Sequence, residues 1–158
     1  MKANELMIGD WVLGLVEDNE EIGKIIAKHP ARIIKIEENG DYAAQCPYTF
    51  DEMYEGDGTL IEDFLWYDTE PIPLTKEIVE KNGFKSTPAF GERALLKETF
   101  EIWIDFKEKR HWINIKVPAP IKSELHLHYY EGYVEYVHEL QHLLRDCELF
   151  VLADNFKV

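Results

Sequence analysis

Apolar and polar side chains alternate on both sides of one tight turn, and this pattern sets the strongest limit on the fold. A turn centred on Glu108 and Lys109 places Ile104 opposite Ile113 and Ile102 opposite Ile115. Successive residues of a strand point to opposite faces, so this register makes one face of the hairpin apolar. The other face pairs Asp105 with Trp112, Trp103 with Asn114, and Glu101 with Lys116. Such an apolar face must be covered, which predicts an antiparallel sheet with helices on one side.

Two helices are expected around this hairpin. The first follows Thr75, which can cap it, and ends at Gly83, which can adopt the left-handed conformation. The second is expected over residues 133–147, after a third strand over 124–130, and residues 148–152 are expected as a short terminal strand. The sequence therefore predicts an α-β-β-β-α module, of the α+β class, over residues 71–158.

Short apolar segments separated by turn formers fill residues 1–70. Five of them are candidate strands, and Asn39-Gly40 is a strong two-residue hairpin signal. These strands are expected over residues 11–16, 23–28, 31–37, 41–45 and 60–67. Closing so short a sheet hides its edges, so this pattern predicts a small SH3-like antiparallel β-barrel. Glu70-Pro71-Ile72-Pro73 would then be a stiff connector between residues 1–70 and 71–158.

Acidic side chains are concentrated in the same N-terminal segment. The chain has 31 acidic and 17 basic residues and a net charge of −14. Residues 1–70 hold 17 of the acidic residues and only 5 of the basic ones. Such a field repels phosphate backbones, which disfavours direct nucleic-acid binding and favours a basic protein partner.

The sequence also bears on location. No apolar run reaches the length of a membrane-spanning helix, and the first residues do not have the pattern of a secretory signal. Cys46 and Cys147 lie far apart without CxxC spacing, which argues against a disulfide framework. These features predict a cytoplasmic protein that does not associate with membranes.

One short motif has the spacing of a metal site. His138-Glu139-Leu140-Gln141-His142 fits H-E-x-x-H, in which two histidines one helical turn apart bind zinc and the glutamate activates a water molecule. On a helical wheel, however, both histidines fall on the polar face, and no third ligand follows at the extended spacing. We interpret this as a solvated helix face without a cofactor. The alternative is a zinc-dependent hydrolase with His138 and His142 as ligands and Glu139 as the catalytic base.

A second motif resembles a calcium-binding loop. Asp51, Glu55, Asp57 and Glu62 have part of the spacing of an EF-hand loop. Met53 stands where the loop requires an oxygen ligand, and the flanking segments do not have a helical pattern. We interpret the segment as a solvated acidic loop and a candidate surface for binding the partner.

Trp103 and Trp112 lie together on the polar face of the expected hairpin. Two exposed tryptophans on one sheet face form either a recognition platform or a contact between the two halves of the chain. We favour the contact between the halves.

Three stretches of the chain are distinctive: residues 2–6 with 8–12, residues 70–75 with 82–84, and residues 136–141. Together they resemble a family of small uncharacterised proteins from Bacteroidetes genomes and their prophages. The family usually has glutamine and asparagine where this chain has Glu139 and His142. The resemblance therefore implies that the metal motif is a local accident, and it implies no activity.

Together these observations predict a non-enzymatic accessory or interaction protein, borne on a prophage or another mobile element. It would bind its partner through its acidic N-terminal half. The zinc-dependent hydrolase is the alternative.

Overall fold

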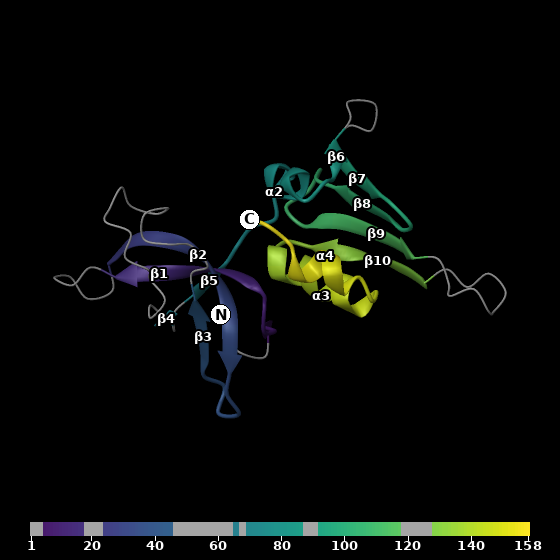
Figure 1. Ribbon diagram of the computed structural model, residues 1–158. Coiled ribbons are helices and arrows are strands. Elements are labelled where there is room, and N and C mark those ends of the chain that lie inside the picture. Colours follow the sequence, from purple (N-terminus) through teal and green to yellow (C-terminus); the bar gives the residue numbers. More distant parts are fainter. Residues whose placement is uncertain (1–4, 18–23, 46–64, 67–68, 87–91, 118–127) are drawn as a thin grey trace, which may run out of the picture. The chain divides into compact units, whose positions relative to one another are not determined.

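The computed structural model describes residues 5–17, 24–45, 65–66, 69–86, 92–117 and 128–158. The chain forms two compact units, Met1–Ile72 and Pro73–Val158, and each is described by itself (Figure 1). The sequence predicts this division after residue 70. Thr69–Pro71 form a strand of the first unit, so the first part of the expected connector belongs to a sheet.

The first unit contains one antiparallel sheet with the strand order β4-β3-β2-β1-β5. Each strand pairs with the next along the chain, except that β5 returns to pair with β1. Among the described residues no pairing joins β4 to β5, so closure into the expected barrel is not observed there. The strands are β1 (Trp11–Glu17), β2 (Ile25–Ile36), β3 (Tyr42–Gln45), β4 (Leu65–Trp66) and β5 (Thr69–Pro71).

Two of the expected strands are in fact one, because β2 continues through Pro30. The N–H of Ile33 donates to the carbonyl of Asp10 at 3.0 Å, so odd-numbered residues in this part of β2 bond toward β1. Pro30 therefore faces the other side, where β3 pairs only with residues from Arg32 onward. Since no strand of the described ranges pairs there, the missing N–H of proline removes no hydrogen bond from the described ladder.

A turn with one buried carboxylate precedes β1. The carboxylate of Asp10 is fully buried and accepts a hydrogen bond from the N–H of Met7 at 2.7 Å. Gly9 has a φ of 90°, a conformation that glycine adopts most readily. The core beside this turn also includes Tyr42, whose hydroxyl lies 3.0 Å from the Thr69 hydroxyl. The rest of that core consists of Leu6, Val12, Ala31, Ile33 and Ala44.

The second unit contains a five-stranded antiparallel sheet with the order β10-β9-β8-β7-β6. The predicted hairpin register is confirmed, since Ile102 lies opposite Ile115 and Ile104 opposite Ile113. The sheet has five strands instead of the expected three, because β6 and β7 were missed in the sequence. The strands are β6 (Lys85–Ser86), β7 (Arg93–Lys97), β8 (Glu101–Asp105), β9 (His111–Val117) and β10 (His128–Val134).

Three helices accompany this sheet, α2 (Lys76–Lys81), α3 (Val137–Asp146) and α4 (Phe150–Asp154). The predicted cap of α2 is confirmed, because the Thr75 hydroxyl accepts a hydrogen bond from the N–H of Ile78 at 3.3 Å. The expected terminal strand is wrong, since α4 occupies most of that segment. Helix α3 begins later than expected, because residues 133 and 134 complete β10.

The predicted apolar face of the sheet is buried. Helix α2 contacts β6 and β7, and α3 contacts β10 (Figure 1). Ile102, Ile104, Ile113 and Ile115 on β8 and β9 are fully buried, as are Leu140 and Leu144 on α3. This confirms an α+β fold. No helix in the described part of the chain has the length and apolar character needed to span a bilayer.

Candidate functional site

Helix α3 presents the H-E-x-x-H motif, but not on a solvated face. His138 is only 6% exposed, and its ring stacks on that of Tyr136 with centroids 5.8 Å apart. The ring of His142 meets that of His138 edge-on, also at 5.8 Å. The expectation that His138 is solvated is therefore wrong. Helix α4 packs against α3 and widens its buried face, as the hydrogen bond from the buried Gln141 side chain to the Ala153 carbonyl shows.

Glu139, the candidate catalytic base, caps the start of the same helix. One carboxylate oxygen accepts hydrogen bonds from the N–H groups of Glu135, at 2.6 Å, and Tyr136, at 3.2 Å. These N–H groups lie at the positive end of the helix dipole, where a carboxylate is stabilising. A structural role therefore accounts for the position of Glu139.

No three His, Cys, Asp or Glu side chains within the described ranges are arranged to hold a metal ion. His126 lies outside those ranges, and of His128 only the backbone, paired with Val117 in the sheet, is described. The paired rings of His138 and His142 are thus the described part of the alternative zinc site, which stays a prediction.

The candidate residues of the acidic loop, Asp51, Glu55, Asp57 and Glu62, lie outside the described residues.

The face of the second sheet opposite the isoleucines contains both candidate tryptophans. Trp103 and Trp112 are half-buried on β8 and β9, and Tyr133 on β10 lies beside Trp112 and is 53% exposed. The Trp112 indole N–H donates to the Glu131 carboxylate at 3.0 Å. The structure thus brings the aromatic residues together on one sheet face, as their alternation predicts.

Next to this face lies an ion pair, in which the Arg93 Nε is 2.8 Å from the Asp105 carboxylate. Burial alone raises the pKa of Asp105, but the hydrogen bond from Arg93, the N–H of Lys107 and the charges of both side chains hold it below its usual value. The face therefore has fixed, internally satisfied charges around its aromatic residues.

The second unit has an apolar groove that the sequence does not predict, which we call the α4 groove. It has a volume of about 470 Å³ and lies between the β7–β8 turn and α4 with its connection to α3. Val151 is 79% exposed and Phe150 is 54% exposed. The lining residues are Glu98, Thr99, Phe100, Glu148, Leu149, Phe150, Val151, Leu152 and Asn155. The sequence signal for it is the apolar character of residues 149–152, within the segment 148–152 that the sequence predicts as a short terminal strand.

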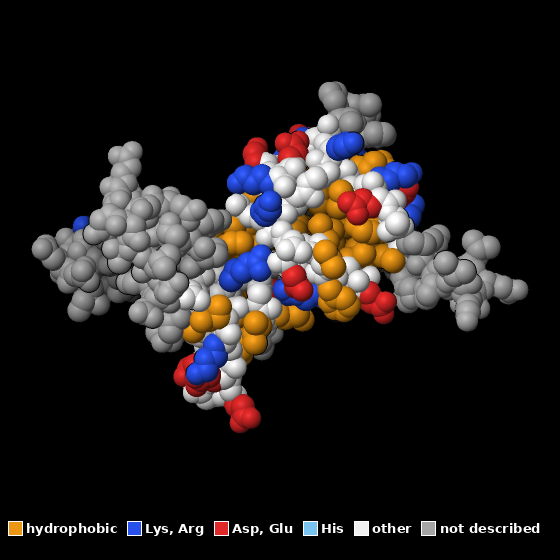
Figure 2. Space-filling view, viewed as in Figure 1, with side chains coloured by type: hydrophobic (Ala, Val, Ile, Leu, Met, Phe, Trp, Pro, Cys, Tyr) orange, Lys and Arg blue, Asp and Glu red, His pale blue; other side chains and the backbone are white. Residues whose placement is uncertain are grey.

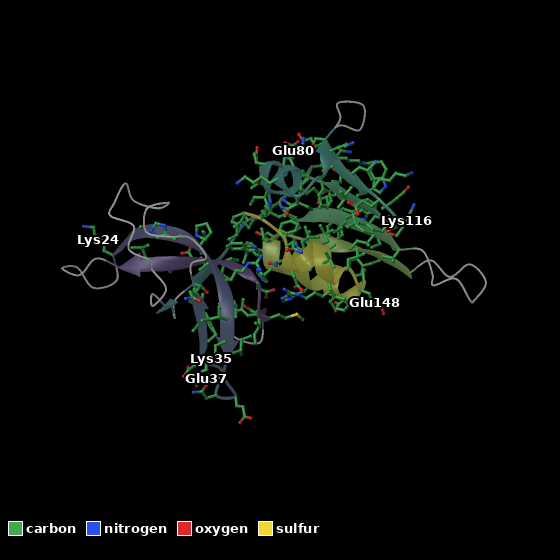
Figure 3. All side chains as sticks on the ribbon, in the orientation of Figure 1. Lys24, Lys35, Glu37, Glu80, Lys116 and Glu148 are labelled. Atoms are coloured by element: carbon green, nitrogen blue, oxygen red, sulfur yellow. The ribbon has the colours of Figure 1, made fainter. Side chains whose placement is uncertain are left out.

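Figure 2 shows hydrophobic side chains gathered on this face of the second unit, with both acidic and basic side chains at their border. Glu148 lies at the end of α3 beside α4 (Figure 3). It has a φ of 62°, in the left-handed region that favours glycine. The N–H groups of Glu148 and Leu149 donate to the carbonyls of Arg145 and Leu144, which closes the end of α3.

Comparison of the chain with protein-family models, with curated proteins and with solved structures finds no match.

Proposed function

We propose that this protein is a non-enzymatic accessory or interaction protein that binds a basic protein partner through its acidic N-terminal half. The observation that carries the proposal is the charge distribution, with 17 acidic and 5 basic residues within residues 1–70. Carboxylates at this density attract Lys and Arg side chains and accelerate association at low ionic strength.

The described residues of the first unit support this reading, because their few cations are already engaged. The Lys28 ammonium lies 2.5 Å from the Glu70 carboxylate, and Lys35 pairs with Glu37. The Arg32 guanidinium lies 4.6 Å from the centre of the Trp11 ring. A partner that supplies additional Lys and Arg side chains would therefore meet an excess of carboxylates.

We also propose a fold for the first unit, a family for the chain and its location in the cell. A meander whose fifth strand returns to the first, as the order β4-β3-β2-β1-β5 does, supports an SH3-like barrel for the first unit. We further propose that the chain belongs to the uncharacterised Bacteroidetes and prophage family that it resembles, and that it acts in the cytoplasm.

Charge reversal tests the binding proposal. Partners captured from a lysate at low ionic strength would be purified and their affinities measured for the native chain and for a variant with Asp51, Glu55, Asp57 and Glu62 replaced by lysine. The matched control reverses four exposed carboxylates of the second unit, Glu80, Glu92, Glu108 and Asp146. We expect the first variant to lose at least about tenfold in affinity, corresponding to roughly 1.4 kcal/mol. Equal affinities for native chain and loop variant, or no purified partner that binds the native chain, would refute the proposal.

A further inference from the structure

We propose that the α4 groove is a second binding site, for a segment of a partner protein in which an apolar side chain adjoins a lysine or arginine. This site lies in the second unit and does not depend on the acidic N-terminal half. Its volume of about 470 Å³ is within the range of pockets that bind ligands.

The apolar surface of the groove is held in place, so its exposure is not that of a loose chain end. Ala153 and Phe156 anchor α4, since both are fully buried. The Gln141 side chain donates to the Ala153 carbonyl at 2.9 Å, and the N–H of Lys157 donates to the Asn82 side chain at 2.8 Å. A short, anchored helix that nevertheless exposes adjacent apolar side chains is typical of an interaction site.

The charges around the groove select the partner. Glu98 and Glu148 line it, no lysine or arginine does, and neither carboxylate has an ion-pair partner among the described residues. In the same unit, other carboxylates are paired, such as Glu101 with Lys97 and Asp105 with Arg93. Two unpaired carboxylates beside an apolar surface favour a cation next to an apolar group.

The backbone conformation of Glu148 also supports a role for its carboxylate in this groove. Glycine is the residue that most easily closes a helix in the left-handed conformation, whereas any residue with a Cβ is strained there. This chain has a glutamate at that position, with a φ of 62°, at the rim of the groove. Strain retained at a surface site suggests that the side chain has a function, and here it supplies one of the two carboxylates.

The same charges disfavour other occupants. An anionic lipid surface or a nucleic acid would bring phosphates toward Glu98 and Glu148. A second copy of the chain would bring further negative charge, since each copy carries −14. A basic and apolar protein segment is the occupant that matches both features of the groove.

A panel of fluorescent synthetic peptides, in which Leu, Ile or Phe adjoins Arg or Lys, tests the site on the full chain by fluorescence polarisation. Matched peptides replace the basic residue by glutamate or the apolar residue by serine. The groove variants are Glu98→Gln with Glu148→Gln, and separately Val151→Ser. Their controls are Glu80→Gln and Ile34→Ser, which alter an exposed carboxylate and an exposed apolar residue elsewhere.

We expect some basic and apolar peptides to bind, and each groove variant to weaken that binding by about tenfold. The control variants, and the chain with its acidic loop reversed in charge, should bind as the native chain does. Binding lost only in the loop-reversed chain would assign the peptides to the acidic half and overturn the groove proposal. The groove proposal would also be overturned if no peptide of the panel binds. It would be overturned, too, if the chain self-associates and Val151→Ser abolishes this self-association without weakening peptide binding.

Discussion

Replacing Glu139 separates its role as a helix cap from the role of a catalytic base. Glu139→Ala removes a carboxylate that accepts two backbone N–H groups, at 2.6 and 3.2 Å, at the start of α3. Losing a cap costs about 0.5–2 kcal/mol, and the interaction of a carboxylate with the helix dipole contributes about 0.3–1 kcal/mol. Because Glu139 is half-buried, we expect the alanine variant to lose about 1.5 kcal/mol of unfolding free energy. Glu139→Gln keeps an acceptor oxygen and should lose about 0.5 kcal/mol.

Equilibrium unfolding in urea measures these differences, provided that the slope of the unfolding free energy against denaturant is unchanged. Asp146→Ala is the matched control, because it removes a carboxylate from the last turn of α3, where the helix dipole does not favour one. Equal stability of Glu139→Ala and the native chain would refute the capping argument. The zinc alternative would gain support if untagged protein contained near-stoichiometric zinc that is lost in His142→Ala.

Three further outcomes follow from described contacts. Gln141→Leu should lower the unfolding free energy by about 0.5–1.5 kcal/mol, because it removes the 2.9 Å hydrogen bond to the Ala153 carbonyl, which then keeps the longer bond from the N–H of Phe156 at 3.4 Å. Calorimetry measures this, and a variant as stable as the native chain would contradict it. Glu148→Gly should raise the unfolding free energy by about 0.5–1 kcal/mol. Glycine relieves a backbone strain of about 1–2 kcal/mol, and its greater conformational entropy in the unfolded chain offsets part of this gain. A urea midpoint that does not rise would contradict this prediction. Asp105 has a lowered pKa in the folded chain, so it adds stability above its unfolded pKa that is lost as the pH falls through its folded pKa. Asp105→Asn should therefore weaken the dependence of stability on pH in the acid range, and an unchanged pH profile would show that the Arg93 pair is not responsible.

The hairpin in the second unit was predictable because local chemistry determines it. The alternation on both sides of Glu108 and Lys109 leaves one register in which every isoleucine lies on the same face, and the structure has that register. The cap at Thr75 and the positive φ of Gly83 were predictable for the same reason, since both depend only on neighbouring residues.

The features that the sequence did not reveal depend on contacts between distant elements. The buried Gln141 side chain bonds to the Ala153 carbonyl of α4, twelve residues further along the chain. Residues 148–152 are predicted as a strand, but the chain turns at Glu148 and Phe150–Asp154 form a helix. The α4 groove likewise needs the β7–β8 turn to lie beside α4, across about fifty residues of chain. Strand β6 has only two residues, too few for an alternation to be recognised.

The return of β5 to β1 has a consequence for how the two units fold. Val12 pairs with Pro71, so the first sheet cannot be completed until nearly the whole unit has been synthesised, and closing so long a loop slows folding. Every strand pair in the second sheet joins neighbours along the chain. The second unit closes a loop of similar length, because the N–H of Leu74 donates to the Glu135 carbonyl and Pro73 pairs with Tyr136. A chain that ends before Thr69 lacks the strand that pairs with β1, so we expect it to leave the first sheet incomplete.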